Sequence, residues 1–498
     1  MKKIFLIISM AVLFVSCEKD LDQVPISAAT TATFYTQPND FIQASNAVYN
    51  DLKGYPDRQL NLSETRSDNL YAVSDGGVRD WEGINSFHKT IAANVYVSEA
   101  WNANFNGIAR ANILLEQLAK NGSVITSAPL RLRLEAEAKF LRAFFYFDLV
   151  RWFGKVPLAD HPLTASEAMN LPRATVTEVY ALILSDLQFA GANLPEVHAA
   201  ADKGRATKYA AKAVEALVHM TRSGPTYGIE GPGLAVNEWA QAGTLLNEII
   251  ASNKYSFLPS YPGIFSFTNE NNAEVVFDVQ YATGLSPVVG STFPWVLVPD
   301  AWFLSQGKTV QGGLTIRPIA KDLLNAYAPA DTRKAFSIQS GFTNAGVTET
   351  NSFFKKYVDL TKVPANRVDW PINFIVIRYT DILMMKAECI LKGAAVGSQA
   401  DVDAIVTQVR NRAGIAGAAT GVTMTQLMDE RRKEFAGEGS RWHDLVRSGT
   451  VETVMAAWIT AEDIQHQMQP FQKNYIIYPI PQAELDARPG LYTQNQGY

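Results

Sequence analysis

Cysteine is nearly absent from this chain, and its absence removes two kinds of architecture. Only Cys17 and Cys389 are cysteines among the 498 residues, so neither a disulfide framework nor a cysteine-rich zinc site is possible. The six histidines are scattered and show no HExxH motif or other paired metal-ligand spacing. GxSxG, P-loop and calcium-loop patterns are missing as well. The sequence thus indicates no catalytic motif and no cofactor, although it leaves a structural calcium ion open.

Charge is scarce too, which argues against nucleic acid as a partner. Charged residues make up 19% of the chain, acidic residues outnumber basic ones by 49 to 44, and no basic run marks a predicted face. Phosphate binding needs a basic surface. The chain is 47% hydrophobic and 11% aromatic, so it can bury a sizeable core. A surface poor in charge and rich in aromatics and amides suits neutral, hydroxyl-rich ligands.

Long hydrophobic runs are limited to the first residues. Lys2 and Lys3 precede an apolar stretch from Ile4 to Val15 that only Ser9 interrupts. A positive start before about a dozen apolar residues is typical of a secretory signal peptide, and it is too short for a membrane span. No later stretch reaches 18 apolar residues, so we expect no transmembrane helix in the mature chain.

The end of this segment, Phe14-Val15-Ser16-Cys17, resembles a bacterial lipobox. We predict that residues 1–16 are removed, that Cys17 is acylated, and that residues 17–35 form a polar tether. The alternative is an ordinary signal peptide with an incidental cysteine. Acidic residues directly after Cys17 resemble the surface-export signal of Bacteroidetes-type lipoproteins. The expected location is therefore the outer membrane, lipid-anchored and exposed at the cell surface.

Hydrophobic periodicity predicts a mainly helical body, residues 36–498, built from helix pairs. In the first expected pair, helix 134–153 is followed by a helix that begins at the capping box of Thr175 and Glu178. The other expected pairs are 207–222 and 237–252, 377–391 and 401–412, and 38–53 and 98–120. Such antiparallel pairs suggest a tetratricopeptide-like scaffold and an all-α fold class. Two long irregular stretches, at about 54–97 and 255–372, interrupt the pairs, and loops of this length are often functional.

Several separated motifs, in order along the chain, resemble the SusD/RagB family of nutrient-binding outer-membrane lipoproteins. They are AKFLRAFFYFDLVRWFGKVPL (138–158), LPRAT (171–175), IRYTDILMMKAE (377–388), the segment 430–449, YPIP (478–481) and the tail 493–498. The resemblance implies a tetratricopeptide-like scaffold with a loop-rich ligand-binding subdomain. It also implies a partner, a TonB-dependent transporter of the SusC type, and ligands that are usually glycans and sometimes peptides.

Sugar recognition needs flat aromatic rings for the C–H face and polar side chains for the hydroxyl rim. The two irregular stretches contain both kinds of residue. The predicted ligand contacts are Trp81, Arg66, Asp68, Asn69, Asn85 and Tyr96 from the first stretch, and Trp295 and Trp302, near Arg317, from the second. Trp81 is the preferred choice. Each tryptophan could instead pack onto the helical body, and Asp68-Asn69 could be turn residues.

The leading functional hypothesis is a non-catalytic receptor that captures oligosaccharide at the cell surface and delivers it to the transporter. The alternatives are a peptide-binding RagB-like lipoprotein, a surface glycoside hydrolase, and a helical scaffold without a small ligand. The remaining motifs favour structural roles: Arg378 paired with a carboxylate, Cys389 buried among apolar residues, and the opposed charges of 430–447 paired along and between helices. His443-Asp444 is too isolated to indicate a metal-dependent hydrolase.

Overall fold

The structure is a computed structural model that describes residues 34–73, 79–309, 311 and 315–498. The predicted signal peptide, Cys17 and nearly all of the predicted tether lie outside these described residues. Within them, no helix has the length and apolarity that a bilayer crossing requires.

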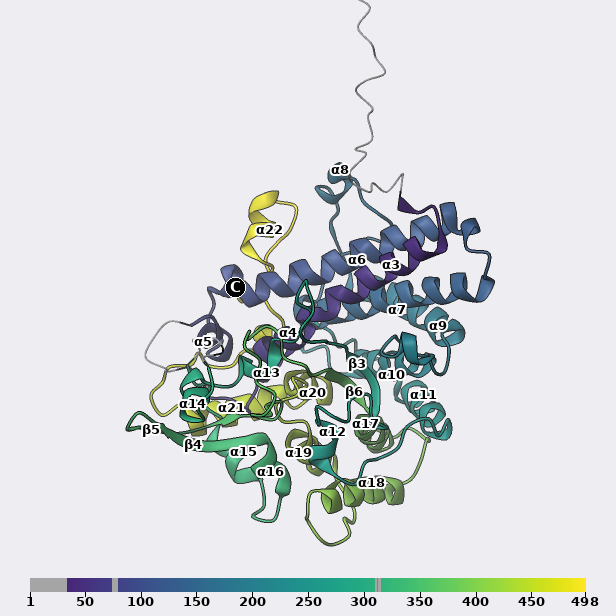
Figure 1. The fold of residues 1–498 in the computed structure, drawn as a ribbon. Coiled ribbons are helices and arrows are strands. Elements are labelled where there is room, and N and C mark those ends of the chain that lie inside the picture. The colour runs from purple at the N-terminus through teal and green to yellow at the C-terminus, as the bar shows by residue number, and fades with distance from the viewer. Residues whose placement is uncertain (1–33, 74–78, 310, 312–314) are drawn as a thin grey trace, which may run out of the picture.

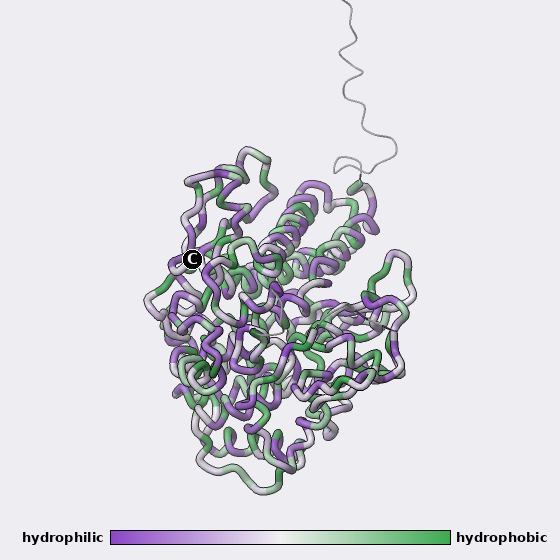
Figure 2. Tube along the Cα trace, turned by 90° about the vertical axis from the view of Figure 1, so that its left-hand side faces the viewer, coloured by the Kyte–Doolittle hydropathy of each residue, from purple (hydrophilic) through white to green (hydrophobic). Residues whose placement is uncertain are grey.

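A series of packed helices forms the scaffold, and it confirms the predicted helix pairs. Neighbours in the series pack against each other, and α3 lies on α6 and α7. The helices are α3 (Pro38–Asn50), α6 (Val95–Asn121), α7 (Ala128–Phe153), α9 (Val176–Asn193), α10 (Lys208–Ser223), α11 (Trp239–Ala251), α17 (Tyr379–Leu391) and α18 (Gln399–Arg412). Figure 1 shows α3, α6 and α7 at the top, with α9, α10, α11, α17 and α18 following downward on the right. Hydrophobic and hydrophilic residues alternate along the upper helices (Figure 2).

Helix α7 is the centre of this scaffold. Nearly every residue from Leu134 to Phe153 is buried, as its all-round hydrophobic sequence predicts. The helix starts earlier than expected because the Ser127 hydroxyl accepts from Leu130 N–H and Pro129 favours the first turn. At Gly107 of α6, a Cβ would lie 2.3 Å from the Phe145 ring, so only glycine allows the two helices to pack this closely.

The two irregular stretches carry short elements rather than bare loop. Three antiparallel two-stranded sheets pair β1 (Val156–Pro157) with β2 (Arg173–Ala174), β3 (Val275–Val279) with β6 (Phe374–Arg378), and β4 (Ile338–Asn344) with β5 (Val347–Phe354). The predicted helix at 377–391 is therefore wrong in its first two residues, which end strand β6. Short helices α4 (Tyr55–Arg58), α5 (Asp80–Asn85), α13 (Phe293–Val296) and α14 (Asp300–Ser305) gather on the left of Figure 1, beside the β4–β5 hairpin.

The remaining described helices complete the lower and outer parts of the molecule. They are α8 (Ala165–Ala168), α12 (Tyr261–Ile264), α15 (Lys321–Ala326), α16 (Thr332–Ser337), α19 (Met424–Glu434), α20 (Arg441–Ser448), α21 (Val451–Glu462) and α22 (Gln482–Ala487), with a π-helix, η3 (Gln59–Glu64), and the 3-10 turns η2 (Asp51–Gly54), η4 (Ile91–Ala93), η5 (Gly122–Val124), η6 (Ala200–Asp202) and η7 (Lys473–Ile476). Together with the scaffold they confirm the mainly helical fold class.

The charged segment 430–447 is paired, as predicted, but inside the core. Arg378 donates to Glu434 at 2.8 Å and to Glu438 at 3.0 Å, and Arg333 reaches Glu434 at 3.0 Å. Arg447 pairs with Glu388 at 2.8 Å. Burial disfavours the charge on Glu434, but its arginine partners outweigh burial and hold its pKa far below the ordinary value. These motif residues are thus a buried ionic network that joins α17, α19 and α20.

Two other residues with predicted structural roles lie where they were expected. Cys389 is fully buried in the main core, and burial raises the pKa of its thiol well above 9. His443 is partly buried and packs against the Trp152 ring at 4.4 Å between centroids, and desolvation lowers its pKa.

Candidate functional site

Arg317 is the point where the two irregular stretches meet. The segment that carries it pairs with residues 69–71, since Tyr71 N–H donates to Pro318 O at 2.9 Å and Ala320 N–H to Asn69 O at 3.0 Å. The Arg317 side chain is 2% exposed. It donates to Asn61 Oδ1 at 2.8 Å and to Thr65 Oγ1 at 3.1 Å. Because these partners are neutral, burial lowers the pKa of Arg317 to about 10.

Two of the predicted aromatic contacts surround this guanidinium. The ring of Trp81 lies 4.2 Å from Arg317 Cζ in a cation–π stack. The hydroxyl of Tyr96 accepts a hydrogen bond from Arg317, and its ring is partly exposed at the start of α6. Asn94 places Tyr96 beside α5, because its side chain accepts from Tyr96 N–H and donates to Asp80 O at 2.8 Å. The structure brings Trp81, Tyr96 and Arg317 together.

Trp295 approaches the same region from the second stretch. Its helix, α13, packs against α4 and η3. Asn61, which accepts from Arg317, is in η3, and Thr65 follows η3 directly. Thr292 donates to Asp57 on α4, and Trp295 Nε1 donates to Arg367 O at 2.8 Å. The Arg367 guanidinium covers one face of the indole at 5.1 Å. Trp295 packs against the core on one side and remains partly exposed.

Trp81 differs from the expected open platform. It is only 3% exposed, and its indole N–H meets no acceptor among the described residues. Trp302 differs further, because it is 5% exposed and packs against Phe353 at 5.6 Å in a small core cluster with Phe303 and Trp370. Trp302 therefore packs in the core, the alternative that the sequence left open for each tryptophan, rather than contacting a ligand as preferred.

Four predicted polar contacts lie in the core, and their expected exposure on a loop was wrong. Asp68 is 1% exposed, and Arg66, Asn69 and Asn85 are fully buried. Arg66 lies among the rings of Phe87, Trp442 and Tyr478, at 4.4–5.5 Å from their centroids.

Asp68, Asn69 and Asn85 are satisfied within the protein. Asp68 accepts two hydrogen bonds of 2.8 Å from Arg441, and Asn69 donates to Glu64 at 2.8 Å. Asn85 bonds the backbone at Thr65, Leu70 and Ala72, at 2.6–2.9 Å. The hydrogen bonds of these polar groups hold the first irregular stretch in place within the protein.

Asp57 and Glu99 are site residues that the sequence did not single out. Burial raises the pKa of Asp57 to about 6, with Thr292 as a hydrogen-bond donor and Glu99 nearby. Burial also raises the pKa of Glu99. No sequence signal could have found Asp57, because Tyr-Pro-Asp-Arg reads as an ordinary turn. Among the described residues, no group of three His, Cys, Asp or Glu side chains could hold a metal ion.

The fold and site define a helical-repeat protein whose long insertions gather aromatic and polar side chains on one side. Two family descriptions match the chain: "SusD family" over residues 301–498, and "Starch-binding associating with outer membrane" over residues 21–220. The chain belongs to the SusD/RagB family, which confirms the resemblance drawn from the motifs.

Several individual proteins are similar over nearly the whole chain. SusD-like protein P25 of Formosa agariphila is 26% identical over 97% of both chains. A solved laminarin binding SusD-like protein is 26% identical, with a TM-score of 0.76 over 93% of this chain and all of the other. Surface glycan-binding protein A from Bacteroides fluxus shares the fold, with a TM-score of 0.79 over 92% of this chain and 99% of the other, at 23% identity.

Proposed function

We propose that this chain is a non-catalytic cell-surface receptor that captures oligosaccharide for nutrient uptake and delivers it to a SusC-type TonB-dependent transporter. The observation that carries the proposal is its likeness, along nearly its whole length, to a laminarin binding SusD-like protein. A second relative, 25% identical over 74% of this chain, is named starch-binding protein SusD. Both names concern binding of neutral glucans.

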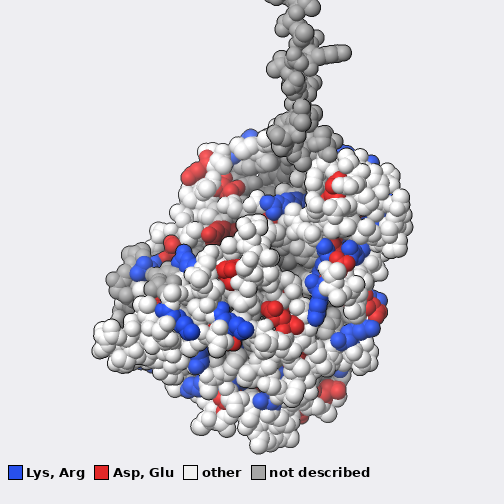
Figure 3. Space-filling view, viewed as in Figure 1, with Lys and Arg blue, Asp and Glu red and all other residues white. Residues whose placement is uncertain are grey.

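The Arg317 region supplies the chemistry that such a ligand needs. Tyr96 and Trp295 offer partly exposed rings for the apolar face of a sugar, and Trp81 stiffens the region by stacking on Arg317. Asp80 and Glu99 are exposed carboxylates next to Tyr96, able to accept from sugar hydroxyls. Figure 3 shows a front face with few charges and wide uncharged areas, which suits a neutral polar ligand.

Binding to a panel of oligosaccharides and peptides tests the proposal. We expect saturable binding of at least one glucan oligosaccharide to the mature chain, and weaker binding when Tyr96 is replaced by alanine. Tyr379→Ala is the matched control, because this tyrosine is also partly exposed but begins α17, away from α5 and α13 in Figure 1. Saturable binding of peptides alone would favour the RagB-like alternative and contradict the glycan receptor.

A glycoside hydrolase needs two carboxyl groups, and Asp57 and Glu99 are two at this site whose pKa is raised by burial. A receptor releases no new reducing ends from a bound polysaccharide, whereas turnover that is lost in Asp57→Asn would identify a glycoside hydrolase. The assay requires only the purified chain and a reducing-sugar readout.

The lipid anchor and the transporter belong to the same proposal. We expect labelled palmitate to enter the wild-type protein in its native host and to be absent from Cys17→Ser, which would then be lost from the outer membrane. Copurification of a TonB-dependent transporter with the wild-type chain tests delivery. A palmitate-free protein confined to the periplasm would contradict both parts.

A further inference from the structure

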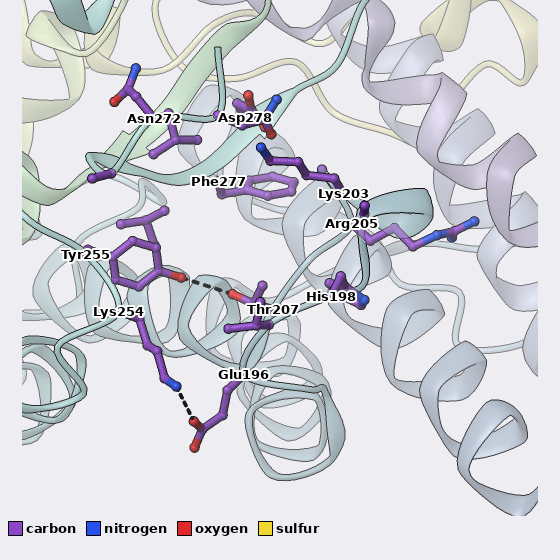
Figure 4. A pocket seen from close by; sticks show the side chains of 17 residues that line it. Glu196, His198, Lys203, Arg205, Thr207, Lys254, Tyr255, Asn272, Phe277 and Asp278 are labelled. Carbon is purple, nitrogen blue, oxygen red and sulfur yellow. Dashed lines mark hydrogen bonds and ion pairs between the residues drawn. The ribbon is translucent and has the colours of Figure 1, made fainter. Parts of the chain in front are cut away.

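Two adjoining hollows lie where the helical scaffold meets strand β3. The first, of about 470 Å³, is shown in Figure 4, with Phe277 at its centre and Tyr255, Thr207 and Lys203 around it. The second, of about 400 Å³, lies between the end of α3 and the residues that follow β3. Both volumes fall in the range of small-molecule sites. Residues 203–205 and Asp278 line both hollows, so the two are neighbours.

Gly204 fixes the segment that separates the hollows. Its φ is +91°, and a Cβ there would lie 2.3 Å from Gln280 Cγ. Only glycine combines this backbone conformation with such a close approach. The contact fixes the backbone from which the side chains of Lys203 and Arg205 extend, beside the end of β3.

The second hollow has more positive charge than its own acids cancel. Lys53 donates to Val288 O at 2.9 Å, and neither Lys53 nor Lys203 has a carboxylate within 4.0 Å among the residues the structure describes. Arg205, by contrast, is neutralised by Asp202 at 2.9 Å and Glu137 at 3.0 Å. Lys53 and Lys203 therefore line one hollow without a carboxylate at ion-pair distance, although Lys203 interacts with Asp278 from further away.

Asp278, the remaining acid of the wall, does little to cancel this charge. It is 4% exposed and accepts from Gln280 Nε2 at 2.6 Å and Asn373 Nδ2 at 3.2 Å. Burial raises its pKa to about 7, so the group is partly uncharged at neutral pH. Asn46 and Asn50 add amides to the same hollow, which can bond sugar hydroxyls.

Two short chain segments connect the second hollow with the candidate glycan site. Lys53 precedes Asp57 by one helical turn, and the segment from Val289 to Trp295 leads directly from the hollow to the exposed indole. Thr292, midway along this segment, bonds Asp57.

We propose that the second hollow binds the anionic group, a carboxylate or a sulfate ester, of an acidic oligosaccharide, with Lys53 and Lys203 as the contact residues. This inference rests on the proposed glycan-receptor function and names the class of glycan. The neutral part of the same chain would lie along Trp295, and the acidic residue would lie between the two ammonium groups.

Calorimetry with three probes tests the inference: a mannuronate hexamer, sulfated laminarihexaose and unmodified laminarihexaose. We expect at least one acidic probe to bind more tightly than the neutral one, with an affinity that falls as salt rises. Lys203→Ala and Lys53→Ala should each weaken the acidic probe about tenfold and leave laminarihexaose within about twofold. Lys473→Ala is the control, since this exposed lysine lines neither hollow and should change nothing.

The outcomes separate this inference from the function on which it rests. Two results overturn the inference but leave the proposed function intact. In the first, laminarihexaose binds more tightly than both acidic probes. In the second, the variant with both Lys53→Ala and Lys203→Ala still binds an acidic probe as tightly as the wild type. An acidic peptide that binds as tightly as the acidic glycans also overturns it, because the hollow would then select charge rather than sugar. Absence of binding to every glycan overturns the proposed function too. Lys203 is exposed, so its variant is expected to fold, and a thermal melt checks this.

Discussion

Two buried arginines, Arg378 in the ionic network and Arg317 at the candidate site, have opposite environments. Arg378 meets carboxylates of Glu434 and Glu438 at 2.8–3.0 Å, which outweigh burial and raise its pKa. Arg317 meets neutral oxygens and the Trp81 ring, and burial lowers its pKa to about 10. Arg378 is held by opposite charges in the scaffold, whereas Arg317 is held at the candidate site by neutral oxygens and an aromatic ring.

Breaking the network should have the largest effect on stability. Arg378→Ala leaves Glu434 and Glu438 without their shared partner in the core, so we expect a loss of about 3–5 kcal/mol in the free energy of unfolding. Lys155→Ala is the control, because its bridge to Glu230 is largely exposed and contributes at most about 1 kcal/mol. Denaturant unfolding measures both. Equal small losses would contradict the distinction between core and surface charges.

Trp302 tests which aromatic residues belong to the core. Trp302→Ala should lose about 3–5 kcal/mol of stability because it leaves a cavity beside Phe303 and Phe353. Affinity for glycan, measured on the fraction that stays folded, should not change. A strong loss of glycan affinity without a loss of stability would show that Trp302 contacts the ligand and is not a core residue.

The ion pairs of Asp68 should make the stability of the protein depend on pH. Burial opposes its ionisation, but Arg432 and Arg441 outweigh burial and lower its pKa to about 2, below the ordinary 3.8. Its carboxylate therefore adds stability, roughly 2 kcal/mol, that is fully present above about pH 4 and is lost as the pH falls toward 2. The stability difference between wild type and Asp68→Asn should shrink over that range. A difference that stays constant between pH 5 and pH 2 would contradict the pairing.

Trp295 should give the smallest effect, and on binding alone. Trp295→Ala is expected to weaken glycan affinity by about 0.5–1.5 kcal/mol, a factor of about 2 to 12, while Trp295→Phe keeps most of it. Calorimetry measures both variants. Unchanged affinity in a folded alanine variant would remove Trp295 from the site.

Much of the scaffold was predictable because its signals are local. Capping at Thr175 and Glu178 and the apolar faces of 134–153 act within a few residues, and both helices form as expected. The limits of prediction appear at Ile377 and Arg378. These two residues pair with β3, a partner about 100 residues away, and no local pattern reveals it.

The site was harder to predict because residue type does not report burial. Arg66, Asp68, Asn69 and Asn85 have the composition of a binding loop, yet their partners come from distant residues such as Arg441 and Tyr475. Tyr96 and Trp295 look no different in sequence, but they remain partly exposed. Lys53 and Lys203 gave no signal, because Asp51 and Asp202 lie close to them in sequence and only the folded structure shows that neither lysine forms an ion pair with a described carboxylate.

A glycan receptor binds its ligand without altering it, and a single calorimetric titration of the mature chain with oligosaccharides measures both properties. We expect heats that saturate with a defined stoichiometry and return to baseline after each injection. Heat that continues after an injection, or the absence of saturable binding to every oligosaccharide tried, would contradict it.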